Sequence, residues 1–151
     1  MSETTQPEIV VGVSGGSRAS VAALRWAADE ARRRHTRLSV ICAWDHSLRP
    51  SPYAEVGASH TDDRARAALH SGLATAMRIA FGRVPPADVD AELTEGVPER
   101  VLIDRSTVAD LLVLGSARPP DAGGLPVGPV IRACLGRARC PVVVVSAGPA
   151  P

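Results

Sequence analysis

Lysine and asparagine are absent from this sequence of 151 residues, and all 17 of its basic residues are arginine. Without lysine, the protein cannot form a Schiff base with a substrate or place a P-loop lysine on a phosphate. The formal net charge is only +1, which argues against a nucleic-acid footprint and against a patch for a membrane surface. We therefore expect no nucleic-acid partner.

Cysteines and long apolar runs are also scarce. None of the three cysteines forms a C-x-x-C pair, and we expect Cys42 to be a small buried hydrophobic residue. A disulfide or metal pair of Cys134 and Cys140 is the less favoured alternative. The longest apolar runs, such as 111–114 and 142–145, are too short to span a bilayer, and the polar start MSETTQPE is unlike a signal peptide. These features predict a cytoplasmic location and no membrane partner.

Apolar runs alternate with helical patterns along the chain. Helices are expected from the N-cap Ser17 to Arg34, over 61–81, from Pro98 onward and over about 130–136. The inward face of the third should carry Val101, Leu102 and Val108. Strands are expected over five apolar runs: 9–13, 38–44, 89–93 near a sheet edge, 110–115 and 141–145.

This alternation predicts one doubly wound α/β domain, a five-stranded, mainly parallel sheet with helices on both faces. We expect a disordered tail over 1–8, the domain over 9–146 and a second tail over 147–151. In such a sheet, ligands bind beyond the carboxyl ends of the strands, at the point where the strand order reverses.

The stretch GVSGG, residues 12–16, fits the Gly-x-Ser-x-Gly signature of a hydrolase nucleophile elbow. Such enzymes need a histidine base in a late strand-to-helix loop. The four histidines fall instead at a predicted helix end, in a predicted loop or within a helix: His35, His46, His60 and His70. A hydrolase with Ser14 as nucleophile is therefore a remote alternative, and we expect no catalytic residue.

Two glycine-rich segments come close to phosphate-binding motifs without completing them. Residues 12–17 lack the order of G-x-G-x-x-G. Residues 123–128 have the glycine spacing of a P-loop, but Pro129 and Val130 stand where Lys and Ser or Thr are required. Both turns still deliver backbone N–H groups and a helix N-terminus to one sheet edge. That geometry suits a phosphate without any lysine.

Three ordered blocks of the sequence resemble the universal stress protein family. VVGVSGGSRASVAALRWAADEA resembles the family's opening, where the first strand ends in Asp-Gly-Ser and leads into Ala-Leu-x-Trp-Ala. EGVPERVLIDRSTVADLLVLGS resembles the third helix and fourth strand, and RACLGRARCPVVVV resembles the closing strand. The resemblance runs from about Ile9 to Val145, nearly the whole chain.

The resemblance implies a five-stranded fold of the adenine nucleotide alpha hydrolase-like type. Many members bind ATP through Gly-x2-Gly-x9-Gly-Ser/Thr after strand four, whereas others lack the pattern and do not bind it. The resemblance also implies a homodimer, often paired through the last strand. Here that strand is Val142–Val145, an apolar edge that otherwise needs covering.

Only part of the family's nucleotide motif is retained. Gly115 and Gly128 match its first and third glycines with the spacing intact, whereas Arg118 replaces the second glycine. Pro129 replaces the Ser or Thr that would contact phosphate, and proline has neither an N–H nor a hydroxyl. Ser14 stands where nucleotide-binding members carry Asp, so a charged acceptor for ribose hydroxyls or a metal-bound water is lost.

The resemblance also places Ala43 where an apolar residue frames adenine. The predicted binding residues are Gly12, Val13, Ser14, Ala43, Gly115, Ser116, Arg118, Gly128, Pro129 and Val130. No metal site is expected.

These features favour a non-catalytic stress-response protein, a homodimeric adaptor or sensor with a partly lost nucleotide pocket. At about 1–3 kcal/mol for each lost polar contact, micromolar ATP binding would fall to millimolar or weaker. The alternative is a switch that retains ATP or another adenine nucleotide, with Arg118 supplying a bidentate phosphate contact. The sequence does not identify a protein partner.

Overall fold

A computed structural model describes residues 6–45, 58–117 and 128–147. Strands and helices alternate through these residues, as the sequence predicts. The elements are β1 (Glu8–Gly12), α1 (Arg18–Arg34), β2 (Arg37–Trp44), α2 (Ala58–Phe81), β3 (Val89–Glu95), α3 (Pro98–Ser106), β4 (Leu111–Ser116), α4 (Pro129–Arg137) and β5 (Val142–Ser146).

The five strands form one sheet in the order β3-β2-β1-β4-β5, and every neighbouring pair is parallel. The predicted doubly wound sheet is confirmed, and β3 lies at an edge as expected. Gly12, the last residue of β1, is level with Ile41 of β2 and Leu114 of β4. The strand order reverses between β1 and β4, so the predicted ligand position lies beyond the carboxyl ends of these two strands.

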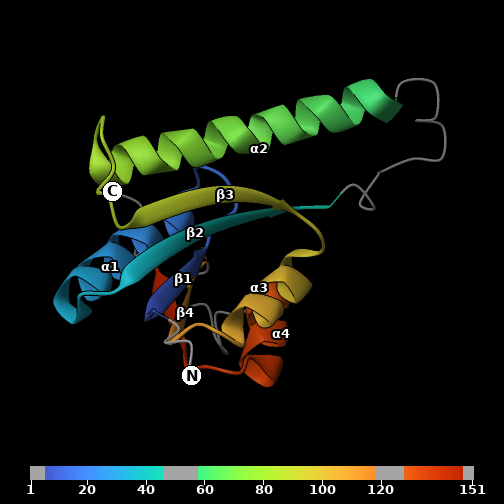
Figure 1. The fold of residues 1–151 in the computed structure, drawn as a ribbon. Coiled ribbons are helices and arrows are strands. Elements are labelled where there is room, and N and C mark those ends of the chain that lie inside the picture. Colours follow the sequence, from blue (N-terminus) through green and yellow to red (C-terminus); the bar gives the residue numbers. More distant parts are fainter. Residues whose placement is uncertain (1–5, 46–57, 118–127, 148–151) are drawn as a thin grey trace, which may run out of the picture.

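Two hydrophobic clusters cover the two faces of the sheet. Helices α1 and α2 lie against one face, and α3 and α4 lie against the other (Figure 1). Strand β1 supplies both clusters, because Ile9 and Val11 point toward α1 and α2 while Val10 points toward α3 and α4. All three side chains are fully buried. This burial explains why the strand is a continuous apolar run.

Helix α1 follows the sequence prediction closely. Ser17 is its N-cap, and the Ser17 hydroxyl accepts a hydrogen bond from the N–H of Ser20. The helix ends at Arg34, and His35 adopts the left-handed conformation that lets its N–H bond back to the last turn. Arg32 and its neighbours are exposed and form ion pairs with acidic residues one turn earlier. The arginine run is thus a solvated helix end.

Three predicted details differ from the structure. Helix α2 begins at Ala58 rather than at residue 61, so His60 belongs to the helix and not to a loop. Strand β1 begins at Glu8, whose N–H donates to an Asp110 carboxylate oxygen at 3.1 Å. The prediction that Val108 faces inward is wrong, because α3 ends at Ser106 and the turn that follows leaves Val108 52% exposed. His46 lies outside the described residues.

Among the described residues, every helix is too short or too polar to cross a bilayer.

Candidate functional site

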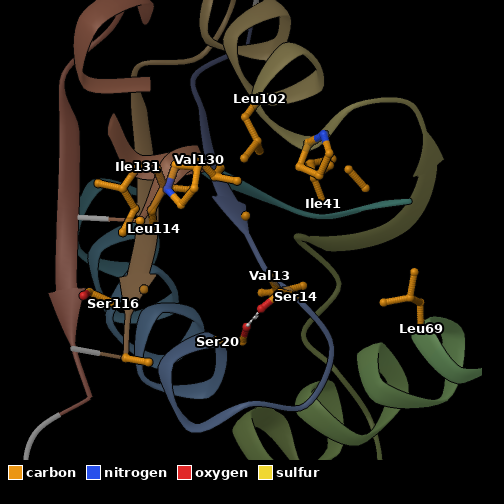
Figure 2. Close-up of a pocket in the computed structure, with 17 residues that line it drawn as sticks. Val13, Ser14, Ser20, Ile41, Leu69, Leu102, Leu114, Ser116, Val130 and Ile131 are labelled. Atoms are coloured by element: carbon orange, nitrogen blue, oxygen red, sulfur yellow. Dashed lines mark hydrogen bonds between the residues drawn. The ribbon is translucent and has the colours of Figure 1, made fainter. Parts of the chain in front are cut away.

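A cavity of about 370 Å³ lies beyond the carboxyl ends of β1 and β4, where the strand order reverses. Figure 2 shows side chains from both sides of the sheet converging on it, with Leu102 from α3 and Leu69 from α2. Its lining comprises Gly12, Val13, Ser14, Ser20, Ile41, Ala43, Leu69, Pro98, Leu102, Leu114, Gly115, Ser116, Ala117, Gly128, Pro129, Val130 and Ile131.

Nine of the ten predicted binding residues lie along this cavity. The tenth, Arg118, lies outside the described residues. Sequence reasoning missed the apolar walls and one hydroxyl: Ser20, Ile41, Leu69, Pro98, Leu102, Leu114, Ala117 and Ile131. Only Ser20 had a local signal, since it lies three residues after the N-cap, where a side chain can take part in capping.

The glycine turn after β1 is shaped by close packing against α2. Gly15 has φ +79°, a left-handed conformation that side chains rarely adopt. A Cβ atom on Gly72 of α2 would lie 2.9 Å from the Gly15 Cα atom and 3.0 Å from the Gly16 nitrogen. The small residues therefore let the helix and the turn touch through their backbones, and they hold this wall of the cavity in place.

Three serine hydroxyls meet at the start of α1. The buried Ser20 Oγ accepts the Ser14 N–H at 2.8 Å and the Ser17 hydroxyl at 2.9 Å, and it lies 3.4 Å from Ser14 Oγ. The Ser14 N–H is thus already bonded within the protein, and the Ser14 hydroxyl lies in the same serine cluster, where either it or Ser20 can donate.

The two retained motif glycines have different surroundings. A Cβ atom on Gly115 would lie 2.2 Å from the carbonyl oxygen of Ala19, because the start of α1 crosses directly over β4. Packing alone thus requires glycine at this position. Gly128 is the N-cap of α4, and a Cβ atom there would meet nothing within 4 Å. Packing among the described residues gives no reason for that glycine.

Ionisable side chains are absent from the described lining of the cavity. Neither His35 nor His70 belongs to the described lining, so neither is placed to act as a base toward Ser14. Cys42 lies fully buried in the core below the glycine turn, as predicted. Burial raises the pKa of the Cys42 thiol, and this effect is larger than the lowering of the pKa by the hydrogen bond from Gly15. Among its described residues, the site therefore offers hydroxyls and backbone groups.

Charged residues gather instead at the amino-terminal end of the sheet, around a second cavity of about 550 Å³. Arg105 of α3 bonds to Glu92 and, at 3.1 Å, to Glu8, while Arg37 pairs with Asp90. Although burial opposes its charged form, the hydrogen bonds to Glu92 and Glu8 raise the pKa of Arg105. The charges at this end are already paired with one another, as in a structural ion network.

Metal-ligating side chains do not cluster in the described part of the chain, where no group of three or more His, Cys, Asp or Glu could hold an ion. Cys134 and Cys140 are both free thiols.

Comparison with known proteins connects this fold and cavity to one family. The model of the universal stress protein family matches residues 7–146. Universal stress protein Rv3134c of Mycobacterium tuberculosis is 34% identical over 142 residues, which cover 94% of this chain and 49% of that protein. The chain thus spans about half the length of the curated relatives that it matches.

Solved structures share the fold. UspA from Lactobacillus plantarum has a TM-score of 0.71 at 20% identity, covering 95% of this chain and 99% of that chain. The Archaeoglobus fulgidus universal stress protein in complex with dAMP has a TM-score of 0.66 at 23% identity, covering 94% and 99%. Because the family model matches nearly the entire chain, this protein belongs to the universal stress protein family.

Proposed function

We propose that this protein is a non-catalytic stress-response protein that acts as a homodimeric adaptor or sensor, with a nucleotide cavity that has lost part of its ligand contacts. The observation that carries the proposal is the lining of the cavity, which has no ionisable side chain among its described residues. A triphosphate needs cations or several aligned donors when it leaves water. The described lining of this cavity supplies few of them.

Two described positions support a weakened nucleotide site. Ser14 offers a neutral hydroxyl where nucleotide-binding members of the family carry Asp, and its N–H is bonded to Ser20. Pro129, at the first position of α4, has no N–H or hydroxyl for a phosphate. The related A. fulgidus protein was solved with dAMP, which makes adenine nucleotides the proper test ligands.

Calorimetric titration with ATP and Mg²⁺ tests this proposal. We expect a Kd in the millimolar range or weaker, since about three lost contacts at 1–3 kcal/mol each remove most of a micromolar affinity. The double variant Ser14→Asp/Pro129→Ser should bind ATP at least about tenfold more tightly. Ser14→Asn/Pro129→Ser is the matched control without the charge. A low-micromolar Kd for the unmodified protein would instead favour the nucleotide switch.

We also propose that the homodimer pairs through β5. This strand bonds only to β4 among the described strands, and Val142–Val145 are half-buried on both faces. The N–H of Leu112 donates to the carbonyl of Pro141, and the N–H of Ala147 donates to that of Ser116. Odd-numbered residues of β5 therefore turn their backbone groups toward β4, and even-numbered residues turn theirs outward.

The substitution Val144→Pro removes one outward N–H and leaves the bonds to β4 intact. We expect it to shift the protein from dimer to monomer in sedimentation velocity, while Val144→Thr, which keeps the N–H, remains dimeric. A monomeric parent protein, or a Val144→Pro variant that stays dimeric, would contradict pairing through this edge.

A further inference from the structure

A third cavity, of about 150 Å³, lies at the other end of the sheet from the candidate site. Helix α1 ends beside it at Arg34 and α2 ends beside it at Phe81, while the starts of β2 and β3 form its base (Figure 1). A protein cavity of about this volume, lined by apolar side chains, binds benzene. The space therefore suits a single six-membered ring.

The interior of this cavity is apolar apart from one hydroxyl group. Its apolar lining consists of Ala28, Ala31, Leu38, Phe81, Pro86 and Val89. Most of this lining is buried or half-buried. The three ionisable residues of the described lining, Arg32, His35 and Asp88, are exposed and therefore lie at the rim. Because no described charge lies inside, the interior suits an uncharged ligand.

The one hydroxyl belongs to Thr36, the residue before β2. Its Oγ1 atom is buried and has no hydrogen-bond partner among the described residues. A buried hydroxyl without a partner costs free energy that valine, which has the same shape, would avoid. The hydroxyl can both donate and accept, so a ligand hydroxyl inside the cavity can satisfy it in either direction.

Backbone hydrogen bonds fix the walls around Thr36. The Thr36 N–H donates to the carbonyl of Ala31 at 3.0 Å, which joins the start of β2 to the end of α1. The Leu38 N–H donates to the carbonyl of Asp88 at 3.0 Å, which joins β2 to the segment before β3. Helix α2 is followed by Gly82, whose φ of +81° turns the chain away. A ligand entering between walls held in this way pays little to order the protein.

We infer that this cavity binds a small uncharged aromatic alcohol, with its ring among the apolar walls and its hydroxyl on Thr36 Oγ1. Apolar walls with a few convergent polar groups are the usual composition of a small-molecule site. The aromatic side chain of Phe81 offers a second ring for the ligand ring to pack against. The inference does not depend on the proposed function, because the two cavities lie at opposite ends of the strands.

Nuclear magnetic resonance of Phe81 tests the inference with phenol as the ligand. Phe81 is the only phenylalanine of the chain, so isotope-labelled phenylalanine gives ring signals from this cavity alone. We expect phenol to shift these signals saturably, with a Kd of about 1 mM or tighter. Toluene, which has a methyl group in place of the hydroxyl, should bind at least about fivefold more weakly. No saturable shift, or equal binding of the two molecules, would overturn the inference.

The substitution Thr36→Val tests the hydroxyl contact. It removes no described hydrogen bond, so the variant should fold, and it should bind phenol no more tightly than toluene. Thr94→Val is the matched control, because Thr94 Oγ1 is also buried without a described partner but does not line this cavity. It should keep the preference for phenol. A preference that survives in Thr36→Val, or is lost in both variants, would contradict the contact.

The substitution Ala28→Leu tests the position of the ring. The larger side chain fills part of the cavity and should weaken phenol binding at least about fivefold. Ala22→Leu makes the same change at another half-buried position of α1, outside the described lining, and should leave phenol binding unchanged. Equal phenol binding by the two variants would place the ligand elsewhere and overturn the inference.

Discussion

The substitution Gly115→Ala is expected to lower the free energy of unfolding by about 3 kcal/mol or more. The new Cβ atom would lie 2.2 Å from the Ala19 carbonyl oxygen and 2.6 Å from its carbonyl carbon. These are backbone atoms of α1, so no side chain can rotate away to make room. The helix would have to move off β4, which would separate buried surfaces at the centre of the sheet.

Urea denaturation of the two proteins measures this loss. Gly136→Ala is the matched control, because that glycine lies in α4 and a Cβ atom added there would meet nothing within 4 Å. There, alanine should stabilise the protein by about 0.5–1 kcal/mol, since it favours the helical conformation. A loss below about 1 kcal/mol for Gly115→Ala would show that α1 does not cross β4 this closely.

Alkaline pH should destabilise the protein through its buried thiols. Burial, together with the nearby Glu99 and Cys140, raises the pKa of Cys134 from 9.0 to about 11. Between these values the unfolded chain has released the thiol proton while the folded chain still holds it. The free energy of unfolding should therefore fall by about 1.4 kcal/mol per pH unit across this interval, and by up to about 3 kcal/mol in total. Below pH 9 this contribution is fully present.

The composition limits how many other side chains contribute to this pH dependence. The chain has no lysine and only one tyrosine, so few other side chains titrate between pH 9 and 11. Burial also raises the pKa of Cys42 and of Cys140, which adds to the fall in the same direction. Urea denaturation at successive pH values gives the slope. Cys134→Ala should show a slope shallower by about one proton; an unchanged slope would mean that this thiol is not the group responsible.

Much of the fold could be predicted because local patterns and global packing agree. Strand β1 is apolar throughout, since both of its faces are buried, and α1 begins and ends where its capping residues indicate. The limits of α2 and the direction of Val108 could not be predicted. These depend on where neighbouring elements end, and residue type alone does not determine that.

Only part of the candidate site could be predicted from the sequence. Gly12, Ser14 and Gly128 could be assigned to one edge because parallel strands bring the turns that follow them together. The walls supplied by Leu69 and Leu102 could not be found in this way. In the sequence these leucines look like ordinary core positions of two helices, and only the packing of α2 and α3 around the strand ends turns them toward a cavity.

The crossing of α1 over β4 has a consequence for how such proteins diverge. A lineage that stops binding its ligand is free to drift at positions held only by that ligand. Gly115 would be retained in such a lineage, because any side chain there collides with Ala19. Gly128, with open space around it, would be free to change. Retention of Gly115 therefore indicates only that the architecture is shared. Retention of Gly128 is more informative about whether a ligand still exerts selection.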